Sequence, residues 1–276
     1  MTGFTVPAET GAAAHTERVG RSFTGAEDPR LARILDAAVR HLHAFAEEVG
    51  LTREEWRSGI DFLTAVGQKC TPERQELILL SDTLGLSMLL EILDGSPAGT
   101  TEPTVLGPFH VPGSPQRSFG DSIVDDPATG GDPLVLTGAV RDPGGDPIAG
   151  AEIDVWQVQP HGRYDIEEDS RKRNLRGVFT SRSDGTFRVV TVRPVDYTIA
   201  DDGPVGEMLR AAGRGSWRPA HIHLAVSAPG FRTLVTHVFD RASPQLHEDA
   251  VFGVRPSLVT SMEGGECHFD VVLARS

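Results

Sequence analysis

The run RPAHIHLAVSAPG, residues 218–230, has the alternation of polar and apolar side chains that predicts a β-strand ending in a turn. Successive side chains of a strand point to opposite faces, so His221 and His223 share one face while the apolar residues beside them share the other. Two imidazoles side by side suggest a metal site, but two ligands do not complete one. The remaining ligands must come from elsewhere in the chain.

The second half of the chain repeats this period of two. Turn signals such as DPGGDP (142–147) and SDG (183–185) separate its apolar segments, and no helical pattern comes between them. Six or more such segments predict an antiparallel β-sandwich or barrel. The segments are LVLTGAV (134–140), EIDVWQV (152–158), GTFRVVTV (185–192), HIHLAVS (221–227), TLVTHVF (233–239) and CHFDVVL (267–273).

Residues 29–93 have a helical period instead. Gly50 supplies a stop for the first helix, and Thr52 with Glu55 forms a capping box for the second, which continues through Phe62 and Val66. The first helix repeats apolar side chains at steps of three and four, through Leu31, Ile34, Leu35, Ala38, Leu42, Phe45 and Val49.

A third helix is predicted to begin at Thr71-Pro72, because proline is favoured at the first helical position. It runs through ELILLSDTLGLSMLLEIL, residues 76–93, and is apolar around much of its circumference. Such a helix is covered on more than one side. Either the core of the same chain covers it or a helix of a partner subunit does, and we expect a homodimer formed through the N-terminal helices.

The change of period predicts an α+β chain in which an all-α helical dimerisation part precedes an antiparallel β-sandwich. We expect a mobile tail over residues 1–25, a helical N-terminal domain with its linker over residues 26–105, and a β-sandwich domain carrying the candidate metal site over residues 106–276. The Pro/Gly-rich connector DGSPAGTTEPTVLGPFHVPGSP, residues 94–115, lies at the transition.

Charge and cysteine content narrow the function classes. A net charge of −13 in 276 residues argues against nucleic acid and anionic membrane as partners, and the basic run SRKRNLRG (170–177) is interpreted as a solvated loop. Cys70 and Cys267 make no disulfide framework, which favours a reducing cytoplasm. The opening residues lack a signal-peptide pattern, and no stretch approaches the roughly 18 apolar residues of a membrane span.

Two tyrosines, Tyr164 and Tyr197, are the only ones in the chain, and both follow strand patterns in turn-rich connections. Each taken alone is interpreted as an ordinary half-buried aromatic residue. With His221 and His223 they form a mixed oxygen and nitrogen set, which we call the tetrad. Phenolate is a hard, strongly donating anion that suits Fe(III) far better than Zn(II).

Six motifs of the chain together have a recognisable pattern: GRYD (162–165), VDYTIADDGPVG (195–206), GSWRPAHIHLAVSAPGFRTLVTHVF (215–239), SDTLGLSML (81–89), PTVLGPFH (103–110) and GAEIDVWQ (150–157). With these motifs the chain resembles the intradiol ring-cleaving dioxygenases, and within them the catechol 1,2-dioxygenase and hydroxyquinol 1,2-dioxygenase branch. The resemblance covers most of the chain and is most specific around the tetrad.

The resemblance implies a prealbumin-like β-sandwich that holds one Fe(III) per subunit through Tyr164, Tyr197, His221 and His223. It implies that Tyr197 leaves the metal when substrate binds and then accepts a substrate proton. It places the cation of Arg218 beside the substrate, where it stabilises developing negative charge. The co-substrates it implies are O2 and a small aromatic diol or triol. Dimers of this family also enclose a tunnel between their helices that can carry a phospholipid.

The family's substrate pocket falls on further residues of this chain. His237 stands where catechol enzymes carry glutamine, and this histidine together with Asp82 is more like the hydroxyquinol enzymes. Thr198 and Ala200 stand where relatives commonly have proline, so the loop after Tyr197 has more freedom. The implied pocket residues are Leu79, Asp82, Val105, Leu106, Gly107, Ile199, Arg218, His237 and Val251.

The expected reaction inserts both atoms of O2 into hydroxyquinol (benzene-1,2,4-triol) and gives 3-hydroxy-cis,cis-muconate, the enol form of maleylacetate. The third hydroxyl needs a polar partner when it is buried, and Asp82 is the candidate acceptor. The alternative substrate is catechol or a chlorocatechol, which would give a cis,cis-muconate.

Two alternatives belong to other classes of function. The strands and turns also resemble prealbumin-like modules that serve as structural spacers, and these would leave the tetrad without a role. A zinc hydrolase could use His221 and His223 with an acid such as Asp240, but it would leave both tyrosines unexplained. Colour separates the three, because tyrosinate bound to Fe(III) absorbs visible light whereas zinc or an empty sandwich does not.

Overall fold

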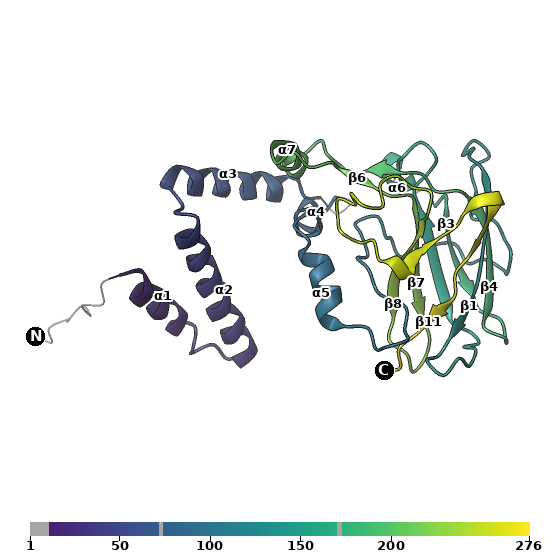
Figure 1. Ribbon diagram of the computed structural model, residues 1–276, viewed down its shortest axis with the longest axis horizontal. Helices are drawn as coiled ribbons and strands as arrows, with labels where there is room; N and C mark the ends of the chain where they lie inside the picture. Colours follow the sequence, from purple (N-terminus) through teal and green to yellow (C-terminus); the bar gives the residue numbers. More distant parts are fainter. Residues whose placement is uncertain (1–10, 72–73, 170–172) are drawn as a thin grey trace, which may run out of the picture. The chain divides into compact units, whose positions relative to one another are not determined.

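The computed structural model describes residues 11–71, 74–169 and 173–276, and the chain divides into two compact units between Leu63 and Thr64. Figure 1 shows the helices and strands of both units. The expected domain boundary at residues 105 and 106 does not coincide with this division and stays a prediction. The helices are α1 (Ala12–Arg21), α2 (Pro29–Glu48), α3 (Arg53–Lys69), α4 (Glu76–Thr83), α5 (Leu86–Asp94), α6 (Asp165–Glu168) and α7 (Pro204–Ala211), with short 3-10 turns at Pro256–Leu258 and Glu263–Gly265.

Helix α1 corrects the expectation of a mobile tail through residue 25. Its sequence AAAHTERVGR opens with three alanines, the best helix former, and the helix packs against α2. Thr16 Oγ1 lies 2.8 Å from His43 Nδ1, and the rings of His15 and His43 stack with their centroids 5.6 Å apart. The part of the expected tail at residues 1–10 lies outside the described residues.

The starts of α2 and α3 follow from local capping chemistry. The carboxylate of Asp28 accepts a hydrogen bond from the backbone N–H of Arg30 at 2.8 Å, and Pro29 begins α2. The predicted capping box of α3 is confirmed, because the backbone N–H of Thr52 donates to Glu55 Oε2 at 2.9 Å and that of Glu55 donates back to Thr52 Oγ1 at 3.2 Å. Both helices keep an exposed apolar face in the single chain, through Leu31, Ile34, Leu42, Phe45, Val49, Trp56, Ile60 and Leu63.

The third predicted helix is two helices, α4 and α5, and its expected start at Pro72 lies outside the described residues. Gly85 separates them in the left-handed conformation, with φ at +74°, which a glycine adopts without strain. Helix α4 buries Leu79 and Asp82, whereas α5 leaves Leu89 and Leu93 exposed. The break therefore allows one sequence segment to serve both a pocket and an exposed apolar face.

Two main sheets and one two-stranded ribbon form the second unit. The first sheet runs in the order β10-β1-β11 with β4 also paired to β1, the second runs β3-β2-β7-β8-β9, and β5 pairs with β6. Most pairs are antiparallel, as expected, but β1 pairs in parallel with both β10 and β11, and β8 does so with β9. The strands are β1 (Pro133–Arg141), β2 (Glu152–Gln157), β3 (Arg176–Thr180), β4 (Thr186–Val192), β5 (Tyr197–Thr198), β6 (Trp217–Arg218), β7 (His221–Ser227), β8 (Leu234–Asp240), β9 (Val259–Thr260), β10 (Glu266–His268) and β11 (Val271–Val272).

The core of this unit lies between the two main sheets, which makes it a β-sandwich. Leu134 and Leu136 of β1 and Ile222 and Leu224 of β7 all belong to one buried apolar cluster. The alternation predicted for β7 therefore holds, and it leaves the histidines of that strand on the face away from the core. Among the helices of the described residues, none has the length and apolarity needed to cross a membrane.

Candidate active site

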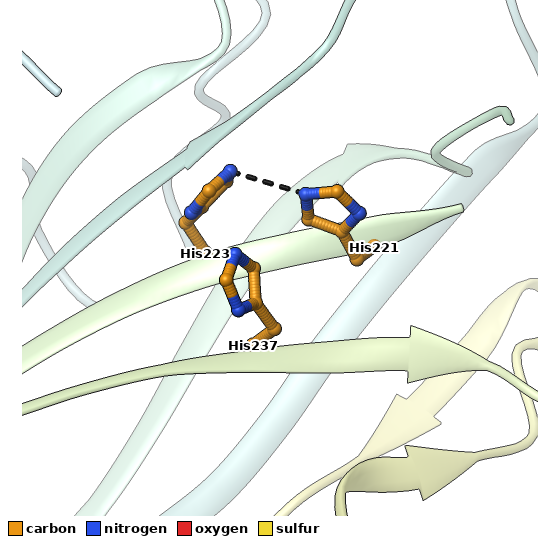
Figure 2. A group of neighbouring side chains, drawn as sticks. All are labelled: His221, His223 and His237. Carbon is orange, nitrogen blue, oxygen red and sulfur yellow. Dashed lines mark hydrogen bonds between the residues drawn. The ribbon is translucent and has the colours of Figure 1, made fainter. Parts of the chain in front are cut away.

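Strands β7 and β8 bring three histidines together. In the register of β7, His223 lies opposite His237 of β8 and also opposite Trp156 of β2. The Nε2 atoms of His221 and His223 are 3.1 Å apart, and Figure 2 shows the ring of His237 directed toward the same space. The ligand atoms that the three buried rings offer all lie within 4.8 Å of one another.

Both tyrosines of the chain reach this histidine group. Tyr164 caps the start of α6 and Tyr197 lies in β5, and both are buried rather than half-buried. Tyr164 Oη lies 2.9 Å from His223 Nε2 and 3.1 Å from Tyr197 Oη. Four donor atoms, two phenolic oxygens and two imidazole nitrogens, thus lie close together from distant parts of the chain.

The imidazoles of the tetrad are held neutral. Burial lowers the pKa of His221 well below its ordinary value, and the nearby cation of Arg218 lowers it further. Burial also lowers the pKa of His223 strongly, with the neighbouring histidines adding to the effect. His221 Nδ1 lies 2.6 Å from the carbonyl oxygen of Pro219, to which its N–H donates, so its Nε2 lone pair faces the tetrad.

Burial shifts the pKa values of the two phenols of the tetrad in the opposite direction, upward. Burial raises the pKa of Tyr164 well above its ordinary value, and it raises that of Tyr197 against a lowering by the cation of Arg218. A cation between the two oxygens would reverse this shift by favouring the phenolates. Neutral imidazoles and buried phenols whose donor atoms converge are therefore suited to a hard, highly charged metal ion. The four side chains of the tetrad form such a group of donor atoms.

Aromatic packing and one buried ion pair hold these donor atoms in place. The ring of His223 stacks on Trp156 with centroids 4.6 Å apart, and Tyr164 stacks on Phe109 at 4.4 Å. Directly after Tyr164, Asp165 accepts hydrogen bonds from Nε of Arg176 at 2.8 and 3.0 Å, with both side chains buried. The interpretation of residues 170–177 as a solvated loop is therefore wrong for residues 174–177, which are buried, while residues 170–172 lie outside the described part.

Comparison with known proteins identifies the family. The model of the family described as "Dioxygenase" matches residues 105–273, and that described as "Catechol dioxygenase N terminus" matches residues 28–100. Over 246 residues the chain is 48% identical to the 6-chlorohydroxyquinol 1,2-dioxygenase of Cupriavidus pinatubonensis, with 88% of each chain covered. The chain belongs to the intradiol ring-cleavage dioxygenases.

Two further relatives agree with this assignment of the dioxygenase. The hydroxyquinol 1,2-dioxygenase of a Rhizobium species is 47% identical over 240 residues, which cover 86% of this chain and 81% of that one. The solved structure of hydroxyquinol 1,2-dioxygenase from Pseudomonas putida DLL-E4 superimposes with a TM-score of 0.88 at 42% identity, covering 96% of this chain and 99% of that one. The prealbumin-like spacer module is thereby excluded for this chain.

Arg218 of the dioxygenase is buried beside the tetrad rather than in a surface ion pair. Its strand β6 pairs with β5, where Arg218 lies opposite Tyr197. Its Nη1 is 3.4 Å from Tyr197 Oη, and its Nε donates to Asp249 Oδ1 at 3.2 Å. The cation is therefore fixed next to the phenol that we expected to accept a substrate proton.

A cavity of about 440 Å³ in the dioxygenase opens next to Tyr197 and Arg218. Two of the expected residues do not line it: Leu106, which is 43% exposed, and His237, which is buried behind the tetrad. Phe109 also lines the cavity and was missed, although it falls in the motif PTVLGPFH. The expected residues that do line it are Leu79, Asp82, Val105, Gly107, Tyr197, Ile199, Arg218 and Val251.

Two buried polar groups lie near the cavity, the carboxyl of Asp82 in its wall and the Thr104–His237 pair behind the tetrad. The carboxyl group of Asp82 is buried, and burial raises its pKa against the lowering effects of a hydrogen bond to Ser87 and of the Arg218 cation. Behind the tetrad, the hydroxyl of Thr104 is hydrogen-bonded to His237 Nδ1, and His237 Nε2 has no partner among the described residues. Thr104 gave no sequence signal, because a lone threonine in a connector has no distinguishing pattern.

Proposed function

We propose that this dioxygenase cleaves hydroxyquinol between its two adjacent hydroxyl-bearing carbons, with both atoms of O2 incorporated, to give 3-hydroxy-cis,cis-muconate. The observation that carries the substrate class is the buried carboxyl of Asp82 in the wall of the cavity beside Arg218. The relatives that are 46–48% identical support it, because they are named for hydroxyquinol or 6-chlorohydroxyquinol.

One Fe(III) per subunit is the metal that we propose for the tetrad, with Tyr164, Tyr197, His221 and His223 as its ligands. The buried phenols support this choice, since zinc sites are built mainly from histidine, cysteine and carboxylate. Asp240, the acid considered for a zinc hydrolase, instead accepts a hydrogen bond from Nε of Arg193 at 2.7 Å. Ferric iron, when bound, supplies a Lewis acid that favours the deprotonated diol and its reaction with O2.

The side chains around the cavity divide the remaining work. Tyr197 Oη accepts a proton from a substrate hydroxyl, and the Arg218 guanidinium 3.4 Å away stabilises the negative charge that develops. Asp82 accepts a hydrogen bond from the third hydroxyl of the ring. Leu79, Val105 and Val251 supply apolar walls that exclude water from the bound ring, and all three are buried.

The test is oxygen uptake by the iron-loaded chain with hydroxyquinol and with catechol in parallel, and with product identified by mass. The proposal expects uptake of one O2 per ring cleaved and a higher kcat/KM for hydroxyquinol. A higher kcat/KM for catechol or a chlorocatechol would reassign the substrate, and no ring cleavage with any diol would reject the reaction.

For assembly, we propose a homodimer formed through the helical N-terminal part, with a phospholipid able to bind between its helices. The support is the exposed apolar side chains of the helices, such as Leu42 at 65% and Phe45 at 54% exposure. In a single chain these side chains would face water, whereas a second chain could cover them. Sedimentation of the purified protein is expected to give the mass of two chains. A monomer at micromolar concentration would contradict the dimer, and lipid extraction with mass spectrometry tests the phospholipid.

A further inference from the structure

The loop that follows β8 carries a buried carboxylate, Asp249, whose two oxygens are both engaged. Oδ1 accepts hydrogen bonds from Nε of Arg218 at 3.2 Å and from the backbone N–H of Val251 at 3.3 Å. Oδ2 accepts one from the backbone N–H of Gly253 at 2.8 Å. The hydrogen bonds from Val251 and Gly253 form within the loop itself, so they fix the position of the carboxylate independently of Arg218.

The loop is in turn fastened to the strand that carries Arg218. The backbone N–H of Ala250 donates to the carbonyl oxygen of Trp217, the residue before Arg218, at 2.9 Å. Phe252 adopts a left-handed backbone with φ at +59°, and its N–H donates to the Asp249 carbonyl oxygen at 3.0 Å. A non-glycine residue held in this conformation indicates a loop whose shape its surroundings determine.

The guanidinium of Arg218 has two ends with different partners. Its Nε end contacts Asp249, and its Nη1 faces Tyr197 Oη at 3.4 Å. A guanidinium is planar, so a bond that fixes Nε also sets the direction in which Nη1 points. Because Arg218 is buried, its charge also needs a counter-charge, and Asp249 is the carboxylate within ion-pair distance among the described residues.

We propose that Asp249 is a positioning residue of the dioxygenase, which holds the Arg218 guanidinium in line with Tyr197 Oη and the substrate cavity. This inference rests on the proposed function for its kinetic consequence, but the placement of Arg218 can be tested without substrate. Asp249 acts through Arg218 and does not line the cavity itself.

The variant to test is Asp249→Asn, which keeps the shape of the side chain and removes its charge. A matched control is Asp142→Asn, because Asp142 is also buried, pairs with an arginine, Arg275, and accepts backbone N–H bonds from Gly144 and Asp146. Asp142 lies after β1, and its contacts are with its own turn and the C-terminal end of the chain. Both variants remove the charge of a buried carboxylate that pairs with an arginine, although the Arg275 side chain is largely exposed, and Asp249→Asn alone alters the surroundings of Arg218.

Kinetics of the iron-loaded full chain form the first arm. Asp249→Asn is expected to lower kcat for hydroxyquinol at least tenfold with KM changed less than threefold, whereas Asp142→Asn changes kcat less than twofold. In an Arg218→Gln background, adding Asp249→Asn is expected to lower kcat less than twofold further. Equal losses in the two single variants, or an undiminished loss in the Arg218→Gln background, would overturn the proposal.

Crystal structures of the full chain form the second arm, and they need no activity. In Asp249→Asn the guanidinium of Arg218 is expected to leave Tyr197 Oη, while Asp142→Asn leaves it in place. An unmoved guanidinium in Asp249→Asn would overturn the proposal even if hydroxyquinol were the wrong substrate. If Asp249→Asn does not fold, Asp249→Glu, which moves the charge by one methylene group, gives the same comparisons.

Discussion

Tyr197 is the residue at which the chemistry of the site comes together. Its hydroxyl oxygen is 3.1 Å from that of Tyr164 and 3.4 Å from Nη1 of Arg218. Burial raises the pKa of Tyr197, and the Arg218 cation works against that rise. A bound cation would favour the phenolate and lower this pKa, so the two roles proposed for Tyr197, metal ligand and proton acceptor, depend on the same oxygen.

The first prediction concerns this double role. Tyr197→Phe removes the oxygen and is expected to lower kcat for hydroxyquinol by roughly 100-fold or more, the usual size of a general-base contribution. The measurement is steady-state oxygen uptake at matched iron content. Phe119→Leu is the control, because Phe119 packs under Arg182 and does not line the cavity, and an equal loss in both variants would argue against proton transfer by Tyr197.

The second prediction concerns Asp82. Asp82→Asn is expected to lower kcat/KM for hydroxyquinol by roughly 10- to 150-fold, since loss of a charged hydrogen bond costs about 1.5–3 kcal/mol, and to affect catechol much less. Catechol lacks the third hydroxyl, from which the carboxylate would accept a hydrogen bond. Parallel assays of both substrates with wild type and variant give the ratio, and equal losses on the two substrates would reject this role.

Much of the candidate site could be predicted from single residues, because the residue types that can bind a metal in this pattern are scarce in the chain. Two tyrosines in 276 residues and a His-x-His pair on one strand face left few ways to build a mixed oxygen and nitrogen set. Asp249 and Thr104 could not be predicted in this way. Each is one common polar residue in a loop, and its importance depends on the contact with Arg218 or His237 that only the fold creates.

At the scale of elements, Gly138 shows why the last predicted strand is split into β10 and β11. A Cβ at Gly138 would lie 1.9 Å from the carbonyl oxygen of Phe269, so glycine in β1 allows that backbone to approach. The backbone N–H of Ala139 donates to Asp270 Oδ1 at 2.8 Å and that of Phe269 donates to the Thr137 carbonyl oxygen at 2.9 Å. The period of two in CHFDVVL predicted a strand correctly but carried no sign of the break.

The third prediction follows from this close approach. Gly138→Ala is expected to lower the free energy of unfolding by about 2 kcal/mol or more, because the backbone of one strand must shift. Gly59→Ala is the matched control, since Gly59 lies inside α3 with open space around it, and alanine there is expected to stabilise the helix by about 1 kcal/mol. Denaturant unfolding of both variants checks the signs, and a neutral Gly138→Ala would contradict the steric account.

The helices were less predictable than the strands. The pattern over residues 76–93 is apolar throughout, so it concealed the left-handed turn at Gly85 that separates α4 from α5. Helix α1 was missed because its ten residues are too few to show a long period. In both cases packing within the fold, rather than periodicity, decides where the helix begins or ends.

At the scale of the whole molecule, the buried histidines couple stability to pH. Burial holds the pKa of His221, His223 and His237 well below the ordinary value of 6.5. Below about pH 6.5 the unfolded chain binds protons that the folded chain excludes, so the free energy of unfolding falls as pH falls. The slope is about 1.4 kcal/mol per pH unit for each such histidine.

The fourth prediction is therefore a loss of stability of the metal-free chain between pH 7.5 and pH 5.5. His237→Gln is expected to reduce the slope, because it removes one histidine whose pKa burial lowers. Urea unfolding at several pH values measures the slope. A slope that is the same in wild type and His237→Gln would show that this histidine is not held neutral in the fold.

We propose that two phenols and two imidazoles, brought together from three places in the chain, bind ferric iron. The most direct measurement is the metal content and visible absorption spectrum of the purified, iron-loaded full chain. We expect one iron per chain and a burgundy colour from tyrosinate-to-iron charge transfer, both lost in Tyr164→Phe combined with Tyr197→Phe. A colourless protein, or iron and colour unchanged in that double variant, would show that these four side chains do not hold ferric iron.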